Sequence, residues 1–149
     1  MKAKYVHTNI VAKDWRALAN FYINVFGCKP KPPERNLKGK WLDSATSLMN
    51  AHARGIHLYL PGYAANGPTL EIFQYSRAAK RKKKLINRPG FTHIAFSVKD
   101  VRQALQNVIN HGGGKIGNVV RTNIRGAGKI EFVYACDPEG NIIELQRWE

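Results

Sequence analysis

Four side chains that bind metals well stand at equivalent points of a pattern that occurs twice in the chain. The sequence from His7 is HTNIVAKDWRAL and that from His93 is HIAFSVKDVRQA, so a histidine, a Lys-Asp pair and an arginine recur in step. The copies also end alike, because a glycine stands four residues before Glu71 in GPTLEIFQY and four before Glu144 in GNIIELQRW. The chain is therefore predicted to contain two related units.

These residue types point to a divalent metal. Strand residues alternate faces, so a histidine on the first strand and a glutamate on the last strand of each unit can point into a shared cavity. A lone strand histidine is more often structural, and a lone glutamate is usually solvated. Because the residues recur at equivalent points of a duplication, we favour one divalent metal per chain, bound by His7, Glu71, His93 and Glu144. Such ligands suit Zn, Ni, Co, Mn or Fe(II).

The elements that would position these residues follow the order strand, helix, then two or three strands. In the first unit we predict a strand over about 4–11, a helix that Asp14 caps and Gly27 ends, and strands within ARGIHLYLPG and PTLEIFQY. The stretch GCKPKPPERNLKGK contains three prolines and is predicted to be an edge strand or a loop. WLDSATSLM fits either a short helix or a strand.

The second unit repeats this order. GFTHIAFSV is predicted to be its first strand, and Asp100 to cap a helix that ends at His111 and three glycines. IGNVV, KIEFVYA and NIIELQRW are predicted to be strands, DPEG a tight turn, and VVRTNIRGAGK flexible. The expected fold class is α+β, with βαβββ modules at 1–76 and 90–149 joined by a basic linker at 77–89.

Length and composition fit one ordinary domain. The chain has 149 residues, of which 44% are hydrophobic, and nothing in it resembles a signal peptide or a membrane-spanning run of about 20 apolar residues. We therefore expect a soluble, cytoplasmic protein without a membrane partner. The two cysteines, Cys28 and Cys136, lack CxxC spacing and are expected to be reduced thiols.

The net charge of +14 is concentrated in one segment. Seven of the twelve residues from Arg77 to Arg88 are basic. Such a run is most often a solvated linker. It could also steer an anionic small molecule toward a cavity, or, least favoured, bind nucleic acid, for which no recognised motif is present.

The segments HTNIVAKDWRALANFYINVFG, PGFTHIAFSVKDV and VYACDPEGNIIELQRW resemble the vicinal oxygen chelate superfamily. This superfamily includes glyoxalase I, methylmalonyl-CoA epimerase, fosfomycin-resistance proteins, extradiol dioxygenases and bleomycin-binding proteins. The resemblance implies paired βαβββ modules whose sheets form a cupped, barrel-like cavity around a metal. It also implies that the ligands are His7, Glu71, His93 and Glu144, with two metal positions open to a substrate. The metal would stabilise an enolate-like charge while Glu144 or Glu71 moves the proton, and Glu144 is preferred because its segment resembles the family most closely.

The ligand set matches that of bacterial glyoxalase I. Epimerases of the superfamily tend to have Gln at the place of Glu71, and dioxygenases use only the triad that corresponds to His7, His93 and Glu144. In bacterial glyoxalase I, an arginine and an asparagine that hold glutathione come four residues after the first and second ligands. Val11 and Tyr75 stand there in this chain. Glutathione is therefore not supported as the substrate.

The resulting hypothesis is a metal-dependent lyase or isomerase that acts next to a carbonyl of a small anionic substrate, and that forms a homodimer. The alternative is a bleomycin-resistance type of protein that sequesters its ligand. Phe73 and Tyr75, at even spacing from Glu71, are candidate substrate walls or core residues. Arg121 and Arg125 are candidate anion-binding residues or exposed. Of His52 and His57, which must face opposite sides of a strand, one can enter the cavity, and His111 is predicted to end a helix.

Overall fold

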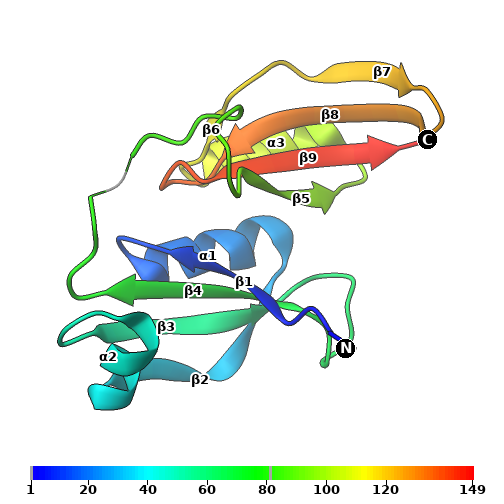
Figure 1. Ribbon diagram of the computed structural model, residues 1–149. Helices are drawn as coiled ribbons and strands as arrows, with labels where there is room; N and C mark the ends of the chain where they lie inside the picture. Colours follow the sequence, from blue (N-terminus) through cyan, green and yellow to red (C-terminus); the bar gives the residue numbers. More distant parts are fainter. Residues whose placement is uncertain (1, 81) are drawn as a thin grey trace. The chain divides into compact units, whose positions relative to one another are not determined.

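The computed structural model describes residues 2–80 and 82–149, which divide into two compact units, Met1–Lys80 and Arg81–Glu149 (Figure 1). The division falls inside the segment predicted to be a basic linker. Arg81, one residue of the basic run, lies outside the described residues.

In the described residues of the first unit, a four-stranded sheet has the strand order β1-β4-β3-β2. β1 runs parallel to β4, and the other neighbours are antiparallel. β2 lies at the edge of this sheet, which agrees with its prolines, and the WLDSATSLM stretch contributes a helix. The elements are β1 (His7–Val11), α1 (Trp15–Phe26), β2 (Lys29–Lys38), α2 (Lys40–Thr46), β3 (His52–Tyr59) and β4 (Thr69–Tyr75).

The ends of α1 follow from its flanking residues, as the sequence predicted. The Asp14 side chain accepts hydrogen bonds from the backbone N–H groups of Arg16 and Ala17, and Gly27 ends the helix with φ of 71°. A positive φ has little cost for glycine because it has no Cβ. The buried side of α1 packs against β3 and β4, and it thereby covers one face of the sheet.

In the second unit, the sheet has the order β5-β9-β8-β6, and β7 also pairs with β8 (Figure 1). β5 is parallel to β9, which repeats the β1-β4 pairing of the first unit. Asp100 caps α3, and His111 is its C-cap, so both predicted helix ends are confirmed. The elements are β5 (His93–Ser97), α3 (Val101–Asn110), β6 (Gly114–Lys115), β7 (Val120–Ile124), β8 (Gly128–Cys136) and β9 (Ile142–Trp148).

The prediction for the segment between α3 and β8 was wrong. IGNVV does not form a strand apart from its last residue, and the stretch expected to be flexible forms β7 and the start of β8. All five residues of β7 are exposed. Backbone pairing with β8, from Val120 opposite Phe132 to Ile124 opposite Gly128, makes this segment a strand. Val120, Thr122 and Ile124 alternate with the polar Arg121 and Asn123, and this strand signal was not used when the segment was predicted to be flexible.

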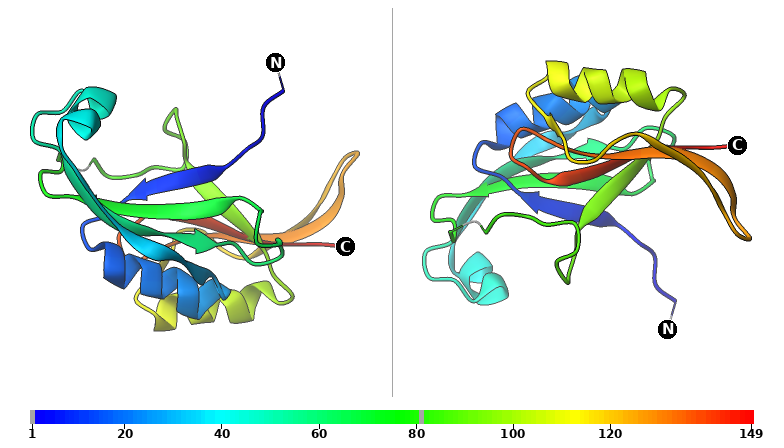
Figure 2. Two further views of the ribbon diagram at one scale, coloured as in Figure 1. Left: turned by 90° about the horizontal axis from the view of Figure 1, so that it is seen from below. Right: turned by 90° about the horizontal axis from the view of Figure 1, so that it is seen from above.

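The α+β fold class is confirmed, with two curved, open sheets (Figure 2). In each unit one helix, α1 or α3, covers one face of the sheet. α3 packs against β8 and β9 as α1 packs against β3 and β4. The buried residues of these faces include Leu58, Leu70 and Ile72 in the first unit and Val133, Ile143 and Leu145 in the second. Among the described residues, no helix is long and apolar enough to cross a membrane.

Candidate metal-binding residues

In the first unit, Glu71 is the centre of a polar group on the sheet face opposite to α1. It lies next to Asn9 of β1 and His57 of β3 in the strand register. His7 precedes Asn9 by two residues and therefore shares its face. The Nε2 atom of His7 is 3.6 Å from Oε2 of Glu71, and Nε2 of His57 is 2.9 Å from Oε1. The structure thus brings the predicted pair His7 and Glu71 together and adds His57.

Both oxygens of Glu71 receive hydrogen bonds. Asn9 Nδ2 donates to Oε2 at 2.7 Å, and the His57 ring lies against Oε1. On the other side of that ring, His57 Nδ1 is 3.0 Å from the hydroxyl of Thr69, which is buried. Burial lowers the pKa of His57, although the negative charge of Glu71 opposes this shift. The ring is therefore neutral near neutral pH.

The second unit contains the equivalent pair. Nε2 of His93 lies 3.0 Å from Oε2 of Glu144, and Nδ1 of His93 lies 3.0 Å from the hydroxyl of Thr92. Tyr134 of β8 stands opposite Glu144 in the register, with its ring edge-on to His93 at 5.3 Å between centroids. Burial, and secondarily the charge of Glu144, raises the pKa of the Tyr134 phenol. Tyr134 thus stays protonated beside the carboxylate.

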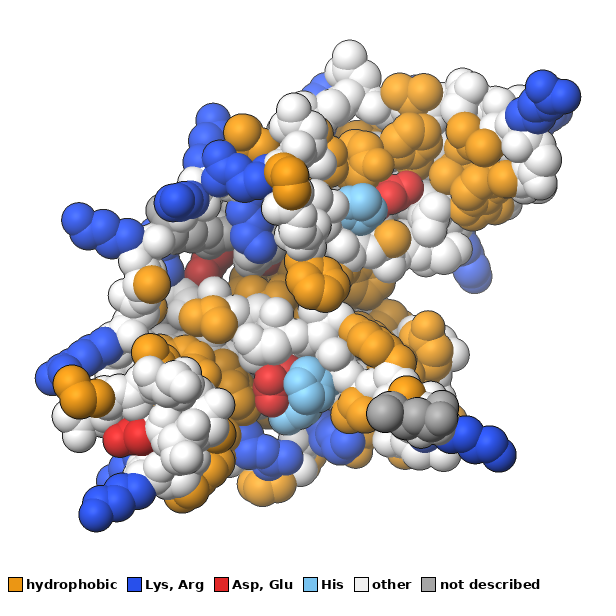
Figure 3. Space-filling model, in the orientation of Figure 1, with side chains coloured by type: hydrophobic (Ala, Val, Ile, Leu, Met, Phe, Trp, Pro, Cys, Tyr) orange, Lys and Arg blue, Asp and Glu red, His pale blue; other side chains and the backbone are white. Residues whose placement is uncertain are grey.

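The spacing of each pair fits two ligands of one metal ion. Ligand bonds of about 2.0–2.2 Å place neighbouring N and O atoms about 3.0 Å apart at octahedral angles and about 3.4 Å apart at tetrahedral angles. The observed separations are 3.0 Å for His93 and Glu144 and 3.6 Å for His7 and Glu71. In residues 2–80 and 82–149, no three such side chains are arranged as a ready-made metal centre. The candidate ligands are therefore two pairs. Figure 3 shows pale blue histidine side chains next to red acidic side chains in two places.

The sequence of residues 4–145 matches the family model of the Glyoxalase/Bleomycin resistance protein/Dioxygenase superfamily. The chain belongs to this superfamily. A search of curated proteins finds no match.

Solved structures support the same fold. A glyoxalase family protein from Bacillus cereus is 17% identical, with a TM-score of 0.77 over 99% of this chain and 94% of that one. The fosfomycin resistance protein FosX from Listeria monocytogenes is 16% identical, with a TM-score of 0.62 over 100% and 96% of the two chains. A glyoxalase family protein from Enterococcus faecalis is 22% identical, with a TM-score of 0.59 over 96% of each chain. At these identities the likeness concerns the fold alone.

Phe73 and Tyr75 lie on the same sheet face as Glu71, but they pack into a small apolar cluster. Phe73 is buried with Leu42 of α2, and Tyr75 is packed against the same cluster. The Phe73 ring is also perpendicular to the His57 ring, at 6.2 Å between centroids. Phe73 therefore borders the candidate ligands, whereas Tyr75 lies two residues further along the strand.

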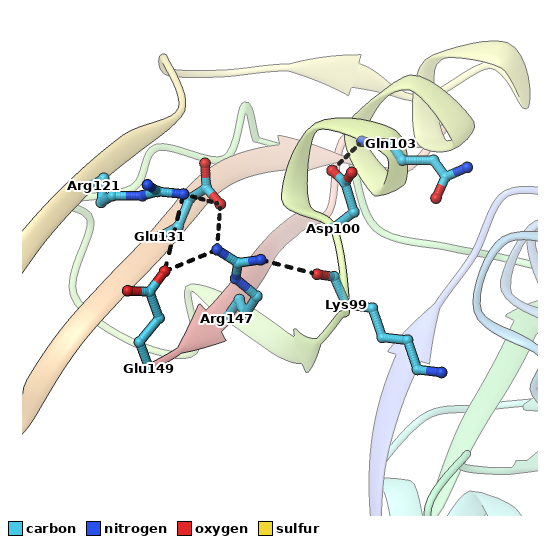
Figure 4. Close-up of polar contacts among 7 residues, drawn as sticks. All are labelled: Lys99, Asp100, Gln103, Arg121, Glu131, Arg147 and Glu149. Carbon is cyan, nitrogen blue, oxygen red and sulfur yellow. Dashed lines mark hydrogen bonds and ion pairs between the residues drawn. The ribbon is translucent and has the colours of Figure 1, made fainter.

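The arginine candidates lie apart from Glu144. Arg121 and Arg147 flank the buried Glu131, at 3.5 and 3.6 Å, and both also approach Glu149 (Figure 4). Arg147 is an odd number of residues from Glu144 and so faces the opposite side of β9, where it reaches the Lys99 carbonyl ahead of α3. Arg121 therefore contacts Glu131 on the face of the sheet opposite to the candidate ligands. Arg125 lies in the turn between β7 and β8.

Several polar neighbours of the carboxylates were not singled out from the sequence. Asn9, Thr69 and Tyr134 were missed, and His57 was predicted only as one of two alternatives. His52, the other alternative, bonds Asn36 and Ser76 instead of Glu71. For Tyr134 a signal existed, because the DPEG turn fixes the register of β8 and β9 and so places residue 134 opposite residue 144.

Proposed function

We propose that the protein is a metal-dependent lyase or isomerase that moves a proton next to a carbonyl group of a small, anionic substrate. One divalent metal per chain would be bound by His7, Glu71, His93 and Glu144. The observation that carries this proposal is the equivalent placing of a histidine Nε2 and a glutamate carboxylate in both units, within 3.6 and 3.0 Å. Membership of a superfamily that contains glyoxalases supports it.

The side chains have different proposed roles. The histidines bind through Nε2, and the Thr92 hydroxyl at Nδ1 of His93 holds that ring in the required orientation. A bound divalent metal supplies Lewis acidity that favours negative charge on a substrate oxygen. Glu144 accepts the substrate proton at a carboxylate oxygen, and the protonated phenol of Tyr134 lies on the neighbouring strand at the same register. Glu71 remains the second candidate for proton transfer.

Contacts to the substrate are proposed for a smaller set of residues. Phe73 is the better candidate for an apolar wall because its ring lies against His57 beside Glu71, whereas Tyr75 lies two residues further along β4. Arg125, in the turn after β7, is the better candidate for an anionic tail, because Arg121 already contacts Glu131. A homodimer stays a prediction.

The test combines metal analysis with an activity screen. Wild-type protein is loaded with Zn, Ni, Co, Mn or Fe(II), and its metal content is compared with that of His7→Ala and His93→Ala. His111→Ala serves as the control, since His111 only ends α3. About one metal per chain in the wild type and in His111→Ala, with loss in the other two variants, is expected. The screen covers hemithioacetals and acyl-CoAs. Equal metal content in all four proteins would refute the ligand set, and ligand binding without turnover would favour sequestration.

A further inference from the structure

The two candidate carboxylates have the same strand register but different neighbours. Asn9 stands beside Glu71 where Ala95 stands beside Glu144, and His57 stands opposite Glu71 where Tyr134 stands opposite Glu144. The third difference lies two residues before each glutamate, where Thr69 in the first unit corresponds to Ile142 in the second. At these three positions the second unit thus has Ala95, Tyr134 and Ile142 in place of the Asn9 amide, the His57 imidazole and the Thr69 hydroxyl, and the imidazole beside Glu144 is that of His93, at 3.0 Å.

The direction of each hydrogen bond around Glu71 follows from the chemistry of the groups. An ionised carboxylate can only accept, so the His57 nitrogen at 2.9 Å must carry its proton on Nε2. In a neutral ring Nδ1 is then an acceptor, and the Thr69 hydroxyl at 3.0 Å must donate to it. Asn9 must likewise present its NH₂ group to Oε2. A continuous chain of donors therefore runs from buried Thr69 through His57 to Oε1.

We infer that His57, oriented by Thr69, is a positioning residue that holds Glu71 by Oε1, so that Oε2, to which Asn9 also donates, is the oxygen that would bind the metal. Glu71 would accordingly be the fixed ligand. Glu144 has the imidazole of His93 at 3.0 Å but, among the described residues, no second neighbour equivalent to His57 or Asn9, and it would be the carboxylate that takes up a proton. This inference rests on the proposed function for its metal, but not for the orientation of the His57 ring.

The packing around His57 supports a fixed ring. The side chain is only 16% exposed, and the Phe73 ring stands perpendicular to it. Gly55, two residues before His57, leaves room for that aromatic ring, because a Cβ there would come within 2.3 Å of Phe73 Cδ1. The imidazole is therefore restrained by Thr69 on one nitrogen, Glu71 on the other and Phe73 on its side.

The first measurement uses the metal-free protein. Nitrogen-15 NMR of the histidine rings should show His57 as the neutral Nε2–H tautomer at pH 7.5. Thr69→Val should remove this preference, while Thr69→Ser should keep it. A His57 ring that carries its proton on Nδ1, or one that is indifferent to Thr69→Val, would overturn the inference. This result does not depend on whether any metal binds.

The second measurement is the affinity for Zn, determined by competition with a chelator. His57→Leu is expected to weaken binding about 10- to 100-fold, as for the loss of a group that orients a ligand. His57→Gln keeps an N–H donor near the Nε2 position and should restore most of the affinity. His52→Leu, on the same strand but bonded to Asn36, should bind as the wild type does.

The outcomes separate the two proposals. Equal affinity of His57→Leu and wild type would overturn the positioning role. Equal loss in His57→Gln and His7→Ala would also overturn it, because His57 would then be a ligand itself. If wild-type protein binds no metal, the proposed function fails, and the ring-nitrogen measurement alone decides how His57 is held. Thermal melting of each metal-free variant verifies that it is folded.

Discussion

Glu71 and Glu144 occupy equivalent places in their sheets. Within residues 2–80 and 82–149, Glu71 is held by donors from both neighbouring strands, Asn9 of β1 and His57 of β3, whereas Glu144 is held by His93 of β5 alone. Glu144→Gln is therefore expected to lower kcat by about 10²- to 10⁴-fold with little change in KM, because an amide cannot take up the substrate proton. Glu71→Gln should mainly weaken metal binding. Steady-state kinetics and metal content of both variants, with Glu34→Gln as the exposed control, measure this difference. Full activity of Glu144→Gln would contradict the assignment.

The two thiols are expected to react slowly, and at different rates. Burial raises the pKa of Cys28 to about 11 and also raises the pKa of Cys136, which is less buried. At pH 8 about a thousandth of Cys28 would be the reactive thiolate. Labelling with a chromogenic disulfide should show a faster phase that Cys136→Ser removes and Cys28→Ser leaves. A faster phase that survives in Cys136→Ser would contradict the order, and urea should make both thiols react quickly.

At the scale of single residues, the sequence could predict the pairs but not the groups around them. The repeated pattern identified His7 with Glu71 and His93 with Glu144, and the structure brings each pair together. Whether all four residues bind one metal stays a prediction. The role of His57 depends on which residues of β3 and β4 stand opposite one another. A connection over 60–68 separates these strands, so no tight turn fixes their register from the sequence.

Among the elements, those with strong local signals were predicted well. α1 and α3 begin at aspartates whose side chains cap them, and their apolar residues recur at helical spacing. β7 was missed although Val120, Thr122 and Ile124 alternate with polar residues; the strand is short, all its residues are exposed, and it pairs with β8. Element prediction thus succeeded where burial or capping marks the sequence, and failed at a short, fully exposed strand.

The approach of β3 to β4 predicts a large cost at one glycine. A Cβ on Gly55 would lie 2.0 Å from the Ile72 carbonyl oxygen and 2.3 Å from Phe73 Cδ1, so Gly55→Ala would force the strands or the ring to move. We expect a loss of about 1–3 kcal/mol in the free energy of unfolding. Urea denaturation measures it. Gly117→Ala, where a Cβ would meet nothing within 4 Å, is the control. Equal stability of the two variants would contradict the packing argument.

For the whole molecule, the question is what the concentrated positive charge does. The chain carries a net charge of +14, and the boundary between the two units falls within its basic run. Three lysines, Lys82 to Lys84, also line an open cavity of about 250 Å³ together with Arg88 and Phe91. A flexible connection between the units would not require this charge. If the substrate is anionic, the positive charge would attract it over a long range and raise its rate of association.

Replacing the lysines of this run is therefore expected to lower kcat/KM at low salt. The loss should shrink as ionic strength rises, because salt screens charges beyond a Debye length of about 8–10 Å. The control replaces an equal number of lysines elsewhere, which lowers the net charge equally without touching the run. The two sets are Lys80, Lys82, Lys83 and Lys84 in the variant, and Lys2, Lys13, Lys40 and Lys129 in the control.

Identical behaviour of the two variants would show that net charge alone matters, and unchanged kcat/KM would leave the segment as a linker. Binding of a DNA duplex at about 50 mM salt, lost in the variant but kept in the control, would instead favour the nucleic-acid alternative, since nonspecific binding is strongest at low salt. We expect no duplex binding.

The prolines of β2 also limit how molecules can aggregate. Pro30, Pro32 and Pro33 have no amide proton, and β2 is the edge of its sheet, so its outer side offers an incomplete row of donors to a strand from another chain. β7 contains no proline, is fully exposed and pairs only with β8 in the described part of its unit. Cross-β association at high protein concentration is therefore expected to begin at β7 and not at β2.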